Sequence, residues 1–337
     1  MFLFYFSTCV DLMDIGIDKE KALKKSKRIR DAWNGFFWEF RVCQRHIRFT
    51  SEERSNYVGD LLNYFDDTLH HLEKFRVQPD YLSSLYETTA VLQMMFIQQD
   101  MIDELVSMLK LGKSSSEEKK FIRNIRNELI GHPISRGDNG ELVSSVFITG
   151  FTEGPLLSYV RYHKSNNYKH NLITHHWKDI FEKHETYLNQ FLDRILDRIT
   201  EILSHYSQTI LKLKNGAGQV PFEKLVRWIS LVFEIYTTNF PLFDPKNLLD
   251  FYNKRESHPR YKLALGLFQD GIGERIGEVL RDINLIIQES DNTKFDPHIK
   301  FDISFTAESS IGEQPPVAKK KSITSLASYL SEIIFSA

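Results

Sequence analysis

The stretch RNELIGHP, which runs from Arg126 to Pro133, combines side chains that could act on a phosphate ester. The arginine is followed at once by an amide, Asn127, and His132 lies six positions after the arginine. A histidine can take or give a proton near neutral pH, and an arginine can hold phosphate oxygens with its fork of N–H donors. Such a set suits metal-independent cleavage of RNA, in which the 2′-hydroxyl attacks and leaves a 2′,3′-cyclic phosphate and a 5′-hydroxyl end.

This stretch ends a predicted helix, which begins after the polar loop KSSSEE, where Ser115 or Ser116 can form the N-cap. The apolar stripe of the helix consists of Ile122, Ile125 and Leu129. At about 100° per residue, Arg126 lies at the edge of that stripe, while Arg123 and Asn127 point away from it. The arginine and its neighbouring amide are therefore expected near the helix surface.

The residues that end this helix decide where the histidine lies. Gly131 suits the left-handed position after a helix, and Pro133 prevents the helix from continuing. His132 then follows the helix end, where the chain can fold back. These are also ordinary helix-end residues: His132 could interact with the last carbonyl groups, and Arg126 could pair with Glu128 or with another helix. On that interpretation the stretch serves structure alone.

In its spacing and helical surroundings, the stretch resembles the R-x4–6-H signature of the HEPN superfamily, which includes RNase toxins of toxin–antitoxin, abortive-infection and CRISPR systems. The signature's arginine falls on Arg126, its polar residue on Asn127 and its histidine on His132. The resemblance implies a helical bundle over roughly residues 50–210. It also implies a homodimer in which two copies of the motif face each other across one cleft, with an antitoxin or another regulatory partner.

The resemblance gives the three residues roles in an endoribonuclease of a toxin or phage-defence type. Arg126 would clamp the phosphate, His132 would act as general acid or base, and Asn127 would orient its neighbours. Many members of the superfamily bind nucleotides or partners without cutting RNA. The alternative is therefore a non-catalytic helical module that binds a nucleotide, RNA or protein.

Binding of RNA by this chain would need a local basic surface, because the formal net charge is −2. Lys119, Lys120 and Arg123 precede the motif on the same helix and are the predicted RNA-binding residues. Charge runs on helices are more often solvated faces, which is the alternative for this group.

Neither a metal site nor a cofactor is predicted. Several histidines lie within residues 163–184, and His175 and Asp179 are four residues apart, but no second ligand pair supports them. The two cysteines, Cys9 and Cys43, favour a reducing cytoplasm over a disulfide scaffold. The apolar opening MFLFYFSTCV is too short to span a bilayer, so no membrane contact is expected.

A period of 3.6 residues dominates the chain and predicts a mainly α fold. Helices are predicted over 18–48, 52–76, 80–110 and 174–212, the last with Thr174 as its cap, and near 221–238, 245–254, 260–270 and 273–290. An alternating pattern near 141–163 predicts a small β-hairpin insertion. The expected domains are an N-terminal helical extension (1–49), a HEPN-like bundle (50–212), a C-terminal helical region (219–290) and a partly flexible tail (291–337).

Overall fold

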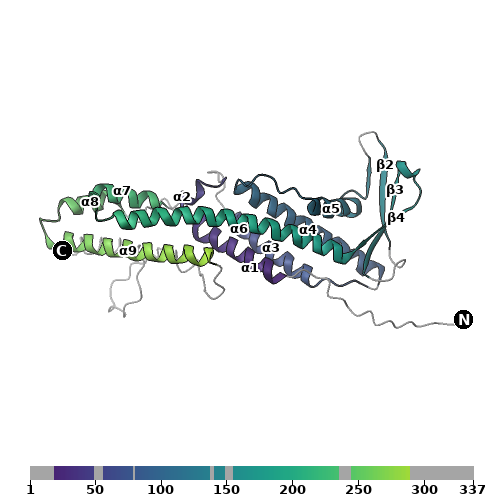
Figure 1. The fold of residues 1–337 in the computed structure, drawn as a ribbon, viewed down its shortest axis with the longest axis horizontal. Coiled ribbons are helices and arrows are strands. Elements are labelled where there is room, and N and C mark those ends of the chain that lie inside the picture. Colours follow the sequence, from purple (N-terminus) through teal and green to yellow (C-terminus); the bar gives the residue numbers. More distant parts are fainter. Residues whose placement is uncertain are drawn as a thin grey trace, which may run out of the picture. The chain divides into compact units, whose positions relative to one another are not determined.

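The computed structural model describes residues 19–48, 56–78, 80–136, 140–148, 155–234 and 244–288. They form a mainly helical chain with a small four-stranded antiparallel sheet (Figure 1). The opening segment MFLFYFSTCV and the predicted tail lie outside the described residues. The chain divides into two compact units, Met1–Lys27 with Tyr57–Leu196 and Arg28–Asn56 with Asp197–Ala337. Two helices, α1 (Lys19–Ala32) and α6 (Trp177–Gly216), contribute one part to each unit.

The first unit is built around α3 (Tyr57–Glu73), α4 (Tyr81–Met108), α5 (Glu117–Arg126) and the first half of α6. Their apolar positions, spaced three and four residues apart, are buried as the sequence predicts. In α3 these positions are Val58, Leu62, Phe65, Leu69 and Leu72. The helices predicted over 52–76 and 80–110 are observed as α3 and α4, while residues 52–55 lie outside the described residues.

A chain of polar side chains is buried between α3, α4 and α6. Nε2 of His184 lies 2.6 Å from Oε1 of Gln98, and Nε2 of Gln98 donates to Oγ1 of Thr68 at 2.8 Å. The Thr68 hydroxyl donates in turn to the carbonyl of Phe65 at 2.7 Å. Because an amide oxygen only accepts, Nε2 of His184 carries the hydrogen. Burial lowers the pKa of His184 from its ordinary 6.5 to about 3, so the ring is neutral.

The sheet follows α5 in the chain and has the strand order β1-β2-β3-β4. Its strands are β1 (Ile134–Arg136), β2 (Leu142–Ile148), β3 (Leu156–His163) and β4 (Asn171–His176). The predicted hairpin is confirmed as β2 and β3, in which Val146 pairs with Val160. The predicted start of α6 is wrong, because Thr174 lies in β4 opposite Ser158, and the helix begins only at Trp177.

The second unit contains the π-helical turn η1 (Trp33–Phe37), α2 (Arg41–Gln44), α7 (Phe222–Val232), α8 (Pro245–Asn253) and α9 (Pro259–Ile287). Residues 18–48 are thus divided by η1 instead of forming one helix. The two helices predicted over 260–270 and 273–290 are one, α9, because Ile272 stays buried and the helix continues through its neighbouring glycines.

Candidate functional site

Helix α5 begins as predicted and ends in an unexpected way. Ser116 is its N-cap, and the helix buries Ile122 and Ile125. At its end the chain widens into a π-helical turn, η2 (Asn127–Gly131), in which the N–H of His132 donates to the carbonyl of Asn127 at 2.8 Å. Such turns are rare in proteins, and those that occur are often found at functional sites.

The prediction that Gly131 adopts the left-handed conformation is wrong. The described glycines with positive φ are Gly112 and Gly140, whereas Gly131 belongs to η2. A β-carbon at Gly131 would lie 2.4 Å from Nη1 of Arg126 and 3.2 Å from Oδ1 of Asn127. The π-helical turn therefore folds the backbone closely against the guanidinium, and a glycine is needed for that approach.

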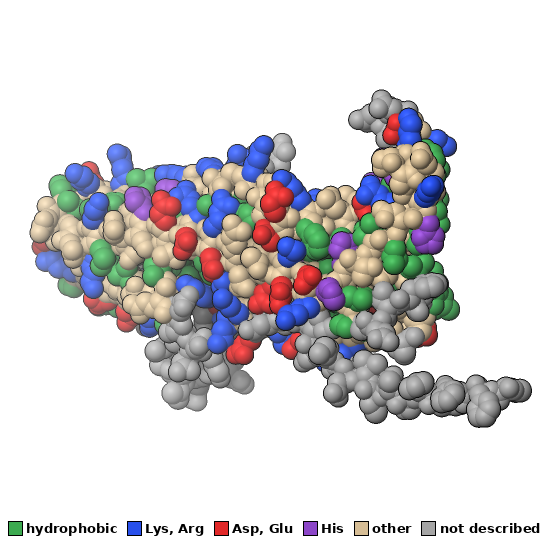
Figure 2. Space-filling model, turned by 45° about the vertical axis from the view of Figure 1, so that its right-hand side comes forward, with side chains coloured by type: hydrophobic (Ala, Val, Ile, Leu, Met, Phe, Trp, Pro, Cys, Tyr) green, Lys and Arg blue, Asp and Glu red, His purple; other side chains and the backbone are tan. Residues whose placement is uncertain are grey.

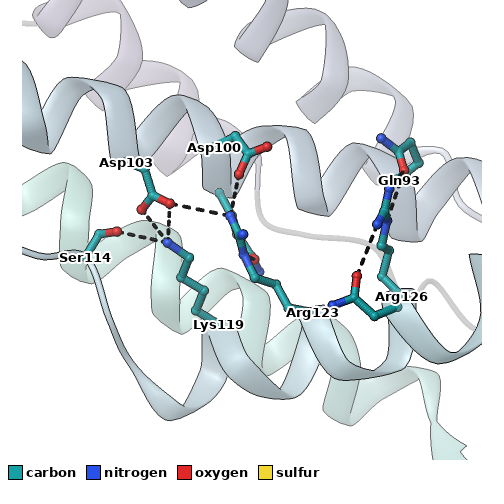
Figure 3. Close-up of polar contacts among 9 residues, drawn as sticks. Gln93, Asp100, Asp103, Ser114, Lys119, Arg123 and Arg126 are labelled. Atoms are coloured by element: carbon teal, nitrogen blue, oxygen red, sulfur yellow. Dashed lines mark hydrogen bonds and ion pairs between the residues drawn. The ribbon is translucent and has the colours of Figure 1, made fainter. Parts of the chain in front are cut away.

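The guanidinium of Arg126 is held in place by neutral partners. Nε and Nη2 donate to Oε1 of Gln93 on α4 at 3.2 and 3.0 Å, and Nη1 donates to Oδ1 of Asn127 at 3.1 Å (Figure 3). The guanidinium carbon lies 4.2 Å from the centre of the Phe96 ring. Within the described part of the chain, no carboxylate pairs with Arg126. Since a guanidinium has five N–H donors, two of them are not used in these bonds.

His132 directly follows the glycine that touches the guanidinium, so its Cα lies about 3.8 Å from that of Gly131. The side chain is exposed, and its ring makes no hydrogen bond to any residue that the structure describes. Arg126, Asn127 and His132 therefore lie within one turn of the chain, linked by the side-chain bond of Arg126 to Asn127 and the backbone bond of His132 to Asn127. The clustering of the three side chains stays a prediction, and the chain turns at this point through the π-helical turn η2.

Two of the predicted RNA-binding residues are engaged by α4. Lys119 forms an ion pair with Asp103, and Arg123 pairs with Asp100 and Asp103 (Figure 3). Arg123 also lies 4.6 Å from the centre of the Phe96 ring, so it packs against α4 instead of pointing away into solvent. The charges of these two side chains are thus largely offset inside the α4–α5 interface.

Lys120 has a different environment. Its side chain is 59% exposed, and its partner, Glu117, is 85% exposed and lies one turn earlier on the same helix. Exposed pairs of this kind contribute little to stability and exchange readily with solvent. On the face shown in Figure 2, basic and acidic side chains are interspersed over the helices. Lys119, Lys120 and Arg123 stay predicted RNA contacts, of which Lys120 is the most accessible.

A polar cluster that the sequence motifs do not predict joins the π-helical turn to the sheet. Oε2 of Glu128 accepts a hydrogen bond from the Tyr159 hydroxyl at 2.6 Å, and Oε1 pairs with Nη1 of Arg161 at 2.9 Å. Burial and this hydrogen bond raise the pKa of Tyr159, which keeps the phenol protonated. Arg126 thus takes its partner from another helix, and Glu128 takes its partners from β3. The signal in the sequence is that Arg161 and Tyr159 are two residues apart in an otherwise mostly apolar strand, so they lie on the same face of it.

His175 of β4 lies next to this cluster. Its ring centre is 5.4 Å from that of Phe121 and 6.0 Å from that of Tyr159, and its Nε2 is buried with no hydrogen-bond partner in the described part of the chain. Burial lowers the pKa of His175, and the nearby carboxylates Glu128 and Asp179 oppose that shift. The described residues contain no group of three or more His, Cys, Asp or Glu side chains placed to hold a metal ion.

None of the described helices combines the length and the apolar character that crossing a bilayer requires. Comparison with known proteins found no matching family model, no matching curated protein and no matching solved structure.

Proposed function

We propose that this chain is a metal-independent endoribonuclease of the HEPN type, in which Arg126 clamps the scissile phosphate and His132 is the general acid or base. The observation that carries the proposal is the environment of Arg126. Its guanidinium is fixed by two amide oxygens and one aromatic ring, and no carboxylate of the described residues offsets its charge. A fixed cation with unused donors, beside an exposed histidine, suits an anion that gains charge during reaction.

The chemistry follows from these groups. The two unused N–H donors of Arg126 would bind the non-bridging phosphate oxygens, and Asn127 would keep the guanidinium turned toward them. His132 would take the proton of the 2′-hydroxyl or give one to the 5′-oxygen as it leaves. The products would be a 2′,3′-cyclic phosphate and a 5′-hydroxyl end. As in the superfamily, the active form would be a homodimer with a toxin or defence role and a regulatory partner.

One observation favours the alternative, a non-catalytic module that binds a nucleotide, RNA or protein. The contacts of Arg126 with Gln93 and Phe96 also tie α5 to α4, which is what a structural arginine would do. In that case the exposed surface around His132 would bind a ligand without reacting with it. Cleavage and binding must therefore be measured separately.

The test is cleavage of a mixed RNA pool in EDTA by the wild type, His132→Ala and Arg126→Lys, each confirmed as folded. The matched control is His176→Ala, because His176 is an exposed histidine of β4. We expect the wild type and the control to cut and to leave cyclic phosphate ends. His132→Ala should cut RNA at least about 100-fold more slowly than the wild type. Arg126→Lys should also cut more slowly, because lysine lacks the fork of donors.

Equal cutting by the wild type and His132→Ala would refute the assigned role of the histidine. If neither protein cuts and both bind RNA equally well, the non-catalytic module is the better description. The chemistry of the product ends separates this enzyme from a contaminating nuclease that leaves a 3′-hydroxyl.

A further inference from the structure

Helix α4 exposes three large side chains near its start, Tyr81, Leu82 and Tyr86, and the last two are the most exposed. Tyr86 is 69% exposed and Leu82 is 58% exposed, although both belong to a helix whose other large apolar side chains are mostly buried or half-buried. Single exposed apolar residues are common on proteins, so exposure alone indicates nothing. The position of this pair relative to Arg126 is what makes it informative.

Tyr86 and Leu82 lie on the same side of α4 as Gln93, the residue that holds the guanidinium. Tyr86 precedes Gln93 by seven residues, which is within about 20° of two full turns, and Leu82 precedes it by eleven, within about 20° of three. At 1.5 Å per residue, the Tyr86 backbone is about 10 Å from that of Gln93 along the helix axis. An exposed aromatic ring thus lies on the same side of α4 as the glutamine that holds the guanidinium, about two turns before it.

The ring also lies on the side of Arg126 from which His132 leaves the helix. Contacts between the two helices run in opposite directions: Lys119 meets Asp103, Arg123 meets Asp100, and Arg126 meets Gln93. The continuation of α5 beyond Arg126 therefore leads toward lower numbers in α4, and Tyr86 lies in that direction. The helical chain continues past Arg126 only through η2, to Gly131, and the exposure of Tyr86 shows that this turn does not cover the tyrosine.

We propose that Tyr86, supported by Leu82, is a stacking platform for a nucleobase next to the phosphate held at Arg126, and that the substrate is single-stranded RNA. The inference rests on the proposed function of that site. Proteins that bind single strands combine cations for the backbone with aromatic faces for the bases. A ring on a helix surface can accept only a base that is free of its own stack, which a paired duplex does not offer. The separation of about 10 Å along α4 is within the span of a dinucleotide.

The test measures binding of a short fluorescent single-stranded RNA to the full chain, with His132→Ala as the parent so that the RNA stays intact. Tyr86→Ala is compared with Tyr86→Phe, which keeps the ring, and with the control Tyr64→Ala, which removes a 48% exposed tyrosine from α3. We expect Tyr86→Ala to weaken binding by about tenfold, and the other two changes to leave it near the parent value. An oligonucleotide without bases should bind equally well with or without the ring.

The outcomes separate this inference from the proposed function. If the parent does not bind RNA at all, both fail. If the parent binds RNA and Tyr86→Ala binds it equally well, the stacking platform is refuted while the phosphate site stands. A change of sedimentation on Tyr86→Ala would show that the ring contacts a second copy of the chain and would also overturn the proposal. Equal dependence on Tyr86 for a duplex would exclude the single-strand preference.

Discussion

Mild acid should destabilise this protein through one buried histidine. His184 is fully buried and neutral, with Nε2 donating to Gln98 and Nδ1 without a hydrogen-bond partner among the described residues. A second proton would have to be placed on Nδ1, in an apolar setting that offers no acceptor. In the unfolded chain the same imidazole is solvated and takes that proton readily.

The size of the effect follows from the two pKa values. The unfolded histidine is protonated below pH 6.5, and the folded one only below about pH 3, because burial disfavours its charged form. Between these values the unfolded state binds more protons, so the free energy of unfolding falls as the pH falls. From pH 8 to pH 5 the loss amounts to about 2 kcal/mol, and at pH 3 and below it approaches about 5 kcal/mol.

The assay is urea unfolding at pH 8 and pH 5, followed by circular dichroism, for the wild type, His184→Gln and His176→Gln. Glutamine at position 184 can still donate to Gln98 but does not titrate. The His184→Gln protein should be less stable at pH 8, yet should lose about 2 kcal/mol less than the wild type on going to pH 5. His176→Gln, at an exposed position of β4, should follow the wild type. Equal losses for all three proteins would refute the burial of a neutral histidine as the cause.

Further substitutions test the site and its surroundings. Gly131→Ala should displace the guanidinium and lower RNA cleavage at least tenfold, with about 1 kcal/mol or less lost in urea unfolding, because the atom that must move ends a flexible side chain. Gly266→Ala, where a β-carbon meets open space, should leave cleavage unchanged. Glu128→Ala should lower the free energy of unfolding by about 2 kcal/mol, since it leaves two polar groups of β3 unpaired; a loss below about 0.5 kcal/mol would show that the cluster does not anchor the turn. Lys120→Gln should leave stability unchanged and should reduce, by about 1, the slope of the logarithm of RNA affinity against the logarithm of salt concentration. Arg123→Gln should lower the free energy of unfolding by about 1–2 kcal/mol. A loss of stability for Lys120→Gln and none for Arg123→Gln would contradict the contacts of α4 with α5.

Most of the fold could be predicted because helical periodicity is a local property. In α6, Trp177, Phe181, Leu188 and Ile195 recur at three- and four-residue spacing and are all buried. The hairpin was equally visible in its alternation. Strand β1 could not be predicted because its three residues are too few to show a pattern. Strand β4 could not be predicted because Thr174, three residues before Trp177, resembles the N-cap of the following helix.

The π-helical turn could not have been predicted from α5 alone. A glycine and a proline after a helix usually indicate that the helix ends at a glycine in the left-handed conformation. Gly131 is needed instead because a β-carbon there would collide with the Arg126 guanidinium, which only the structure shows. The two compact units are likewise each assembled from two separate stretches of chain, which reading along the sequence does not reveal. Both features depend on packing between segments far apart in the chain.

The sequence by itself determined that Arg126, Asn127 and His132 lie close together, because seven consecutive residues at a helix end cannot separate far. Only the tertiary structure decided what surrounds them. The partner of Arg126 is an amide 33 residues away, and the partners of Glu128 are on a strand more than 30 residues away. Whether an arginine meets an amide, as Arg126 does, or a carboxylate, as Arg123 does, depends on the register in which α4 packs against α5. That register is set by the burial of apolar side chains over both helices, and it leaves one cation fixed but not neutralised.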